Sequence, residues 1–506
     1  MTAPLRILYY NWVDYLDDER RGGGVTVYQR NLMAAMDDQP GVGAYFLSAG
    51  VAHDLRSGPP RWEQQRFGPD TDRARRFEVV NSTVLAPAHH GFGSMAQITD
   101  PATEAVFFDF IEKTGPYDVV HFNNLEGLPA AVLKMKERWP QTRVVLSLHN
   151  YYPFCPQVNL WHQERETCDD FDAGRACVNC LPHVHDARHM RLSGGVSQTL
   201  KSLGLRPGSW SYDKAYRWSM RLGGRGARAW RRVKHARPRR WAPAGKLQRI
   251  IPVDGSAYLS RRREMVALIN AHCDTVLCVS DAVRRLALTH GLREEITHTS
   301  YIGTREAAAF ERTTPRDFPE RNDGTLTLAY LGYMRRDKGF YFLLKALEEM
   351  PAAMAARLRF EVAARRGDRV VMARLKDLAP RLAALTYADG YAHDDLDRLL
   401  GSVDVGLVPV LWHDNLPQVA IEMHARHIPL LTADMGGAQE LGRCPEMVFR
   451  AGDIAAFHAR VAALLAGEVD MDTYWQGAMA PVGMAQHMED LMGHYRSPVL
   501  GSVFAP

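Results

Sequence analysis

The sequence lacks the features that mark membrane-spanning proteins and disulfide-stabilised secreted domains. No apolar run reaches the roughly 18 residues of a membrane span, and the opening residues, MTAPLRILYYNW, read as a strand without a signal-peptide pattern. Cysteine is scarce, with seven in 506 residues, and Cys273 and Cys278 fall within apolar runs. An odd number of cysteines in such places argues against a disulfide framework, so we expect a cytoplasmic protein.

Acidic residues are almost missing from one segment. Of the 62 basic and 58 acidic residues in the chain, 20 and 2 fall between residues 188 and 263, which gives this segment a net charge of +18. The other 42 basic and 56 acidic residues give the remainder a charge of −14. The length and the 46% of hydrophobic residues predict two to three globular domains, and the positive field belongs to a single insertion.

Apolar strands alternate with helical patterns along most of the chain. We expect strands at residues 5–10, 117–123, 143–149, 274–280, 325–333, 404–410 and 428–433, and helices at about 25–36, 128–139, 281–290, 340–349 and 482–494. This alternation predicts an α/β protein with parallel sheets, in which ligands bind at the carboxyl ends of the strands. His121 and His149 each end a predicted strand, although a histidine in a strand is more often a structural residue.

Residues 403–441 are the most informative stretch. A strand is followed by a polar turn with Asp414, a helix with Glu422, a second strand and a Gly-rich loop. Pro417 suits the first turn of the helix, so the free N–H groups near its start form an anion site; the residues concerned are Asn415, Leu416 and Gln418. Two carboxylates beside this anion site suit a ligand with phosphate and sugar hydroxyls. The alternative is an ordinary strand and helix with solvated acids.

Asp414 is followed after seven residues by Glu422, and then by the run Asp434-x-Gly-Gly-x-x-Glu440. This pattern resembles the donor-site motif of the retaining glycosyltransferases of family GT4. Most members carry Glu where Asp414 stands, although Trp-x-Asp-Asn-Leu-Pro is similar to one branch. The resemblance implies the GT-B fold, with two Rossmann-like domains facing across a cleft. It predicts an acceptor domain at 1–302 with an insertion at about 151–263, a donor domain at 303–475, and a helix at 476–506 that returns to the first domain.

The resemblance also implies roles for individual residues. Lys338 matches the Lys-Gly position that pairs with the donor diphosphate, whereas Tyr333 stands where many members have Arg, so Arg335 or Arg336 would supply the second cation. The remaining positions are Gly23 and Gly24 at the donor phosphate, Gly390 and Tyr391 at the base, and His149, Asn150 and, with a weaker match, His121 on the sugar or acceptor side. A flexible loop is the commoner explanation of glycines such as Gly23 and Gly24.

The implied reaction moves a sugar from a nucleotide-diphosphate donor to a glycan or lipid-linked acceptor, with retention of configuration. Since no Asp-x-Asp metal motif ends a predicted strand, we expect catalysis without a cofactor. Lys338 and helix N–H groups would stabilise the diphosphate, Asp414 would orient the sugar, and Glu422 would bind the ribose. A nucleotide-sugar epimerase or hydrolase is a rival with the same fold.

Four cysteines lie close together in the insertion: Cys155, Cys168, Cys177 and Cys180. The last two form a Cys-x-x-Cys, whose spacing allows two thiolates to share a metal, and the others would complete a structural zinc site. The spacings of the earlier cysteines are irregular, so reduced thiols in a loop are the alternative. The run HNYYPFCP at 149–156 resembles a GT4 branch with similar cysteines, which implies that this loop shapes the acceptor side.

Aromatic residues are interleaved with the basic residues of the insertion: Trp210, Tyr212, Tyr216, Trp218, Trp230 and Trp241. This pattern suits an anionic membrane surface, a lipid-linked phosphate or single-stranded nucleic acid. Gly223, Gly224, Gly226, Pro238 and Pro243 interrupt it, so no long helix is expected. We expect peripheral membrane contact or capture of an anionic acceptor, against the alternative of a solvated excursion.

A zinc-containing nucleic-acid-binding protein or a non-catalytic scaffold would also combine Cys-x-x-Cys with a basic arm. The sequence disfavours a nucleic-acid partner because the acidic remainder of the chain would repel phosphate backbones.

Overall fold

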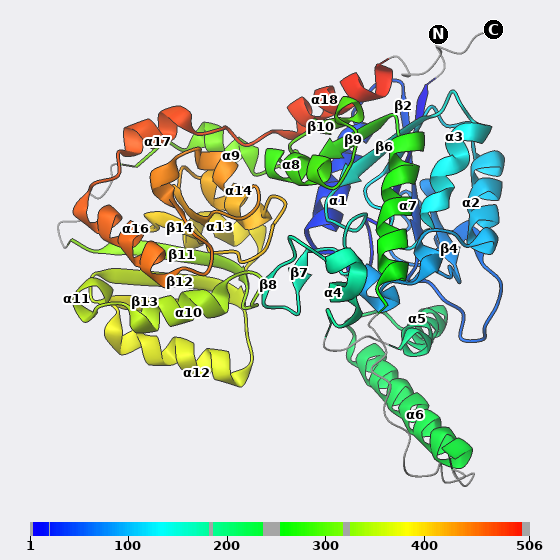
Figure 1. Ribbon diagram of the computed structural model, residues 1–506, viewed down its shortest axis with the longest axis horizontal. Coiled ribbons are helices and arrows are strands. Elements are labelled where there is room, and N and C mark those ends of the chain that lie inside the picture. The colour runs from blue at the N-terminus through cyan, green and yellow to red at the C-terminus, as the bar shows by residue number, and fades with distance from the viewer. Residues whose placement is uncertain (1–3, 20, 182–185, 236–253, 317–323, 498–506) are drawn as a thin grey trace.

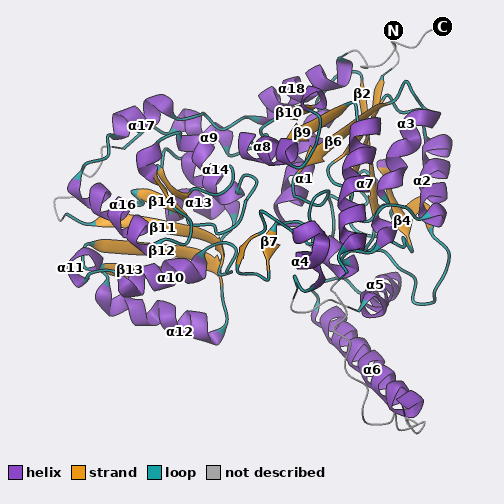
Figure 2. Ribbon diagram, in the orientation of Figure 1, coloured by secondary structure: helices purple, strands orange, loops and turns teal. Residues whose placement is uncertain are grey.

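The structure, a computed structural model, describes residues 4–19, 21–181, 186–235, 254–316 and 324–497. Two α/β units lie side by side, and a helical arm projects from the first of them (Figures 1 and 2). No helix within the described ranges is long and apolar enough to cross a membrane.

The first sheet has eight strands within the described residues, in the order β10-β9-β6-β5-β1-β2-β4-β3. Every neighbouring pair is parallel except β3 and β4. The strands are β1 (Leu5–Asn11), β2 (Val42–Ala49), β3 (Arg61–Gln64), β4 (Arg76–Val80), β5 (Val119–Phe122), β6 (Arg143–Leu148), β9 (Thr275–Cys278) and β10 (Thr297–Thr299). All residues of β5, β6 and β9 are buried, as expected for parallel strands covered on both faces.

The helices of this unit are α1 (Gly23–Asp37), α2 (Pro101–Thr114), α3 (Met135–Arg138), α7 (Ser256–His272) and α8 (Asp281–Thr289). Ser280 caps α8 by accepting a hydrogen bond from the N–H of Val283, as a capping serine should. The helix expected at 128–139 was wrong in form, because a 3₁₀ turn at Ala130–Lys134 precedes the single turn of α3. Residues 130–133 are all buried, so this segment presents no polar face.

The second sheet has six strands in the described part of the chain, all parallel, in the order β13-β12-β11-β14-β15-β16. They are β11 (Leu326–Tyr333), β12 (Leu358–Arg365), β13 (Ala384–Asp389), β14 (Val405–Val408), β15 (Leu430–Ala433) and β16 (Val448–Phe449). The accompanying helices are α9 (Ala307–Arg312), α10 (Phe340–Glu349), α11 (Ala352–Ala355), α12 (Arg369–Leu378), α13 (Leu396–Leu399), α14 (Gln418–His424), α15 (Gln439–Gly442), α16 (Ile454–Ala466) and α17 (Met471–Gly477).

Each sheet reverses its strand order at one place. In the first sheet β1 lies between β5 and β2, and in the second β11 lies between β12 and β14. Chain connections leave such a position in opposite directions, which opens a crevice outside the carboxyl ends of the strands. The loop after β11 and the loop after β14 therefore meet at one edge, and Lys338 and Asp414 lie on these two loops.

The last described helix, α18 (Met484–Arg496), packs against the first unit rather than the second (Figure 1). The hydroxyl of Tyr495 lies 3.1 Å from that of Tyr9 and 2.5 Å from Nδ1 of His121. Nε2 of His487 lies 2.8 Å from the hydroxyl of Tyr28 on α1. The chain thus crosses back to complete the core of the unit that it built first.

The insertion contains a small two-stranded element, β7 (Trp161–His162) and β8 (Glu166–Thr167), the single turn of α4 (Arg175–Val178), and two longer helices, α5 (Ala187–Ser202) and α6 (Trp210–His235). The expectation of no long helix was wrong for α6. A glycine inside a helix costs only about 1 kcal/mol, and α6 packs Tyr212 against Val196 and Leu200 of α5, which offsets that cost. Pro238, Trp241 and Pro243 lie outside the described residues.

Candidate active site

The loops after β11 and β14 are held together by a close backbone contact. Gly339 has φ +75°, and a Cβ atom there would lie 1.6 Å from the carbonyl oxygen of Pro409. The N–H of Leu411 also donates to the carbonyl of Asp337, at 3.0 Å. Only glycine fits this approach, and the contact brings the Lys338 side chain to the β14 loop.

Lys338 and Asp414 form the ion pair at the centre of this edge. Nζ of Lys338 lies 2.5 Å from Oδ2 of Asp414 and 5.1 Å from the ring centre of Trp412. The Asp414 side chain is 9% exposed, whereas that of Lys338 is 28% exposed. The nearly buried carboxylate therefore fixes the ammonium, which keeps donors open toward solvent for a ligand anion.

Gly436 and Gly437 press against the same loop from the β15 side. A Cβ atom at Gly436, where φ is +72°, would lie 1.9 Å from the carbonyl oxygen of Asp414, and one at Gly437 would lie 2.3 Å from that of Asn415. The N–H of Gly437 donates to the carbonyl of Asp414 at 3.0 Å. The two glycines of the motif thus shape the loop that carries Asp414.

Glu422 lies on α14, just after a turn in which Leu416 is buried and Pro417 precedes the first helical residue. Its carboxylate is 3% exposed, accepts a hydrogen bond from the Tyr391 hydroxyl at 2.6 Å and lies 3.5 Å from Nδ1 of His393. Burial raises the pKa of Glu422, against the effect of the Tyr391 hydrogen bond. Gly390, with φ +75°, turns the chain after β13 and brings Tyr391 to this carboxylate.

The β14 loop also touches the first unit. The Ser280 hydroxyl donates to the carbonyl of Asn415 at 2.7 Å, and the Asn415 amide donates to the carbonyl of Leu148 at 3.4 Å. Leu148 ends β6, so Asp414 and His149, which adjoin the two contacting residues, lie on opposite sides of this contact between the units.

Glu440, the last residue of the motif, joins the two units and does not contact the Lys338–Asp414 pair. Its carboxylate accepts hydrogen bonds from the N–H groups of Asp281 at 2.9 Å and Ala282 at 2.7 Å, and from the Tyr301 hydroxyl at 2.8 Å. It therefore occupies the start of α8, where a negative charge is favourable.

Gly24, in the first unit, faces the start of α14 in the second unit. A Cβ atom at Gly24 would lie 3.4 Å from Cγ of Gln418, the first residue of α14. No side chain within the described residues caps the start of α1, where Gly23 has φ +59°. The start of α1 thus lies against the start of α14, and free N–H groups at helix starts favour an anion.

His149 and Asn150 follow β6 in the first unit, next to the contact between Leu148 and Asn415. Nε2 of His149 is 3.2 Å from Oδ1 of Asn123, and burial lowers the pKa of His149 to about 3. The imidazole is therefore neutral at pH 7 and acts as a hydrogen-bonding group rather than a cation. The Asn150 amide donates to Glu126 at 2.6 Å.

His121 is placed differently from the expectation. Its ring is fully buried, with Nε2 2.7 Å from the Ser147 hydroxyl and Nδ1 on Tyr495. Both ring nitrogens are engaged inside the core, so the structure contradicts a position on the sugar or acceptor side. Sequence reasoning missed Asn123, which follows β5 and holds His149. Its position at the carboxyl end of the strand predicted at 117–123 was the available signal.

The second cation expected near Lys338 does not join the Lys338–Asp414 pair. Arg335 is 64% exposed and pairs with Asp337 at 3.0 Å, and the Arg336 guanidinium lies 4.6 Å from the ring centre of Tyr341. Tyr333 is 49% exposed. Among the described residues of this loop, Lys338 alone is ion-paired with Asp414.

The four cysteines lie in the insertion, whose Asp169 is 3.6 Å from Nε2 of His413 on the β14 loop. All four are free thiols. Burial, followed by the nearby thiol groups, raises the pKa of Cys177 to about 12, and burial is also the main cause that raises the pKa of Cys168 and Cys180 to about 11. Among described residues, only Asp17, Asp18 and Glu19 bring three ligand atoms within 4.8 Å of one another, so the four sulfurs do not form such a set.

Several solved structures share this architecture along nearly their whole length. The N-terminal domain of Candida albicans trehalose-6-phosphate phosphatase has a TM-score of 0.54 at 9% identity, covering 97% of this chain and 96% of its own. An alpha,alpha-trehalose-phosphate synthase (UDP-forming) from Burkholderia vietnamiensis gives 0.51 at 13% identity, covering 98% and 99%. Sucrose-phosphate synthase from Thermosynechococcus elongatus gives 0.50 at 14% identity, covering 96% and 94%. The fold is GT-B.

Residues 325–467 match the sequence family described as Glycosyl transferases group 1. This segment is therefore similar to a glycosyltransferase domain. It holds Lys338, Asp414 and Glu422, whereas no curated protein matches the chain. The GT-B fold expected from the sequence is confirmed.

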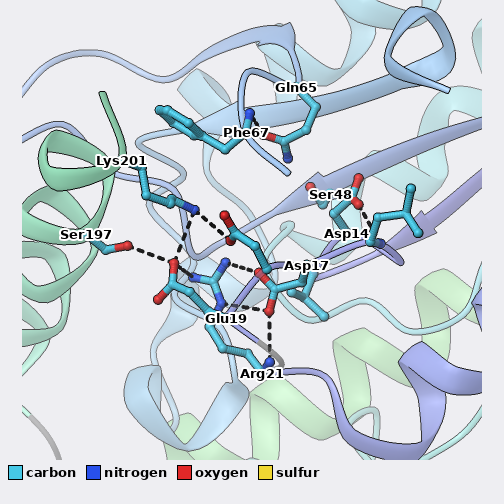
Figure 3. Close-up of polar contacts among 12 residues, drawn as sticks. Asp14, Asp17, Glu19, Arg21, Ser48, Gln65, Phe67, Ser197 and Lys201 are labelled. Atoms are coloured by element: carbon cyan, nitrogen blue, oxygen red, sulfur yellow. Dashed lines mark hydrogen bonds and ion pairs between the residues drawn. The ribbon is translucent and has the colours of Figure 1, made fainter. Parts of the chain in front are cut away.

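A second polar cluster lies in the first unit, between the β1–α1 loop and α5 (Figure 3). Arg21 pairs with Asp17 at 2.6 Å, and Lys201 lies 3.2 Å from both Asp18 and Glu19. Glu78 of β4 lines the same cavity. Its Oε1 atom is buried and has no hydrogen-bond partner among the described residues.

Glu78 gives a testable pH dependence. Burial raises its pKa from 4.5 to about 7, while Lys201 and Arg21 lower it and Glu63 and Asp14 raise it. Because the pKa is higher in the folded state, the stabilising contribution is complete below pH 4.5 and is lost as the pH rises through 7. We expect Glu78→Gln to raise the free energy of unfolding relative to wild type by up to about 3 kcal/mol more at pH 8 than at pH 5.

Denaturant unfolding at both pH values measures this difference. Glu349→Gln, at an exposed site on α10, is the matched control and should give the same small difference at both. A Glu78→Gln effect that is independent of pH would contradict the raised pKa.

Proposed function

We propose that this protein transfers a sugar from a nucleotide-diphosphate donor to a glycan or lipid-linked acceptor, with retention of configuration and without a catalytic metal. The observation that carries the proposal is the Lys338–Asp414 pair, which lies at the carboxyl edge of the second sheet, within the segment that matches the glycosyltransferase family. The UDP-forming synthase with the same fold supports a nucleoside diphosphate as the leaving group.

The reaction needs a stabilised diphosphate leaving group. As the bond from the anomeric carbon to the diphosphate breaks, negative charge grows on the departing oxygens. Lys338 and the N–H groups at the starts of α1 and α14 would stabilise that charge, which is the role that a metal ion plays in other transferases. Gly24 lets the first-unit loop approach the diphosphate closely.

Asp414, Glu422 and His149 would orient the donor. Asp414 holds Lys338 and offers its second oxygen to sugar hydroxyls, and Glu422 would exchange its Tyr391 hydrogen bond for the ribose hydroxyls. The acceptor hydroxyl would attack from the face that the diphosphate leaves, and its proton would pass to the departing phosphate oxygen. Neutral His149 would accept or donate a hydrogen bond at the sugar without placing a positive charge there.

Lys338→Ala and Glu422→Ala test these roles. A lost contact to the developing charge costs about 10²- to 10³-fold in rate, so we expect Lys338→Ala to lower kcat by that factor while the fold is retained. Glu422→Ala should weaken binding of the donor through the ribose. A thermal-shift screen of UDP, GDP and ADP identifies the base, and release of the nucleoside diphosphate from the matching nucleotide sugars measures the rate.

Lys345→Ala, on the exposed side of α10 in the same domain, is the control and should retain wild-type activity. Circular dichroism verifies folding of each variant. Near-normal turnover in both site variants would refute this assignment of the donor site.

A structural zinc ion would be held by the four cysteines of the insertion: Cys155, Cys168, Cys177 and Cys180. It would fix the loop that lies against His413. Elemental analysis of protein purified without chelator should give about one zinc per chain, and Cys177→Ser should lower both the zinc content and the melting temperature. Cys444→Ser, at a thiol far along the chain, is the control. Protein without zinc that melts at the same temperature as metal-supplemented protein would rule out the ion.

A further inference from the structure

We propose that the hairpin of α5 and α6, called here the basic arm (residues 187–235), docks the protein on an anionic lipid bilayer. This goes beyond the proposed function, since it concerns where the protein works rather than what it transfers. In Figure 1 α6 projects away from both sheets. An arm that stands clear of the body is free to meet a flat partner.

The arm is anchored firmly at its base. The Ser197 hydroxyl donates to Glu19 at 2.7 Å, and Lys201, whose side chain is 8% exposed, pairs with Asp18 and Glu19 (Figure 3). Ser197 also accepts a hydrogen bond from the Tyr212 hydroxyl of α6 at 2.9 Å. These contacts tie both helices to the β1–α1 loop, so docking of the arm would fix the orientation of the protein.

One face of α6 is already occupied by α5. Tyr212 and Tyr216 stack with ring centres 6.0 Å apart, and the Tyr216 hydroxyl lies 2.5 Å from that of Ser193. Val196 and Leu200 of α5 complete this small apolar cluster. The helix needs no other partner on that side.

A different face of α6 exposes large apolar side chains. Trp210 is 73% exposed, Trp218 is 64% exposed and Leu222 is 43% exposed. With Lys214 they are spaced four residues apart, so they form one stripe along the helix. Soluble proteins seldom leave such residues uncovered in a row, and a stripe of this kind marks an interaction surface.

Cations surround the stripe. Lys214 lies 4.4 Å from the ring centre of Trp210, and Arg217 and Arg221 are exposed on the neighbouring positions. The whole segment 188–263 carries 20 basic residues and 2 acids. Tryptophan favours the interface between headgroups and acyl chains, while lysine and arginine bind anionic headgroups.

A bilayer fits this surface better than a nucleic acid does. Bases stack on aromatic residues within a basic groove, whereas the stripe lies on the exposed side of a single helix and includes the aliphatic Leu222. The remainder of the chain has a net charge of −14 and would repel a long polyanion. A thin surface layer of headgroups contacts the arm alone.

Co-sedimentation of the full-length protein with vesicles tests the proposal. We expect binding to phosphatidylcholine vesicles that contain phosphatidylglycerol, little binding to phosphatidylcholine alone, and release in high salt. Arg217→Glu with Arg221→Glu should weaken partitioning by at least ~30-fold. Trp210→Ala with Trp218→Ala should also weaken it, and more of the residual binding should be lost in salt.

Matched controls lie on the second unit. Arg398→Glu removes a cation that is 73% exposed on α13, and Val370→Ala trims an apolar side chain that is 67% exposed on α12. Both should bind vesicles like wild type. Release of nucleoside diphosphate in solution should be unchanged in all arm variants, which separates this test from that of the donor site.

Equal binding to the two vesicle types, or binding that neither arm variant reduces, would overturn the proposal. Binding of a single-stranded oligonucleotide with no vesicle binding would assign the arm to nucleic acid instead. Self-association that is lost in the tryptophan variant, without vesicle binding, would make the stripe an interface between copies of the chain.

Discussion

The ion pair between Lys338 and Asp414 depends on glycine at two places. Gly339 lets the β11 loop lie against Pro409, and Gly436 lets the β15 loop lie against the carbonyl of Asp414 itself. A carboxylate that is this deeply buried must be paired, because an unpaired buried charge is costly. The packing of three strand ends therefore dictates where the ammonium lies, and its position is fixed before any ligand arrives.

The same loop joins the two units, so the site and the interface are one structure. Asn415 contacts Ser280 and Leu148 of the first unit, and the Glu440 carboxylate accepts hydrogen bonds from the N–H groups at the start of α8. The motif therefore serves two purposes. Its first part, around Asp414, holds Lys338, and its last residue, Glu440, holds the units together. A change at Glu440 would therefore act on the site through the contact between the units rather than through the ligand.

Local patterns were sufficient where the chain obeys them. Apolar periodicity predicted β11 to within a residue and α10 at its observed bounds. Distant contacts were not readable. His121 lies near the carboxyl end of β5, yet a tyrosine 374 positions later in the sequence contacts its ring and covers it. The length of α6 was missed because its stability comes from packing on α5, which glycine counts do not reveal.

The return of α18 affects how the chain folds during synthesis. Tyr9, Tyr28 and His121 belong to the first unit, but their hydroxyl and imidazole groups meet Tyr495 and His487, which are synthesised after the second unit. Domains usually fold in order as they emerge. Here the first unit lacks these α18 partners until the second unit has been synthesised, so the two units mature together rather than in sequence.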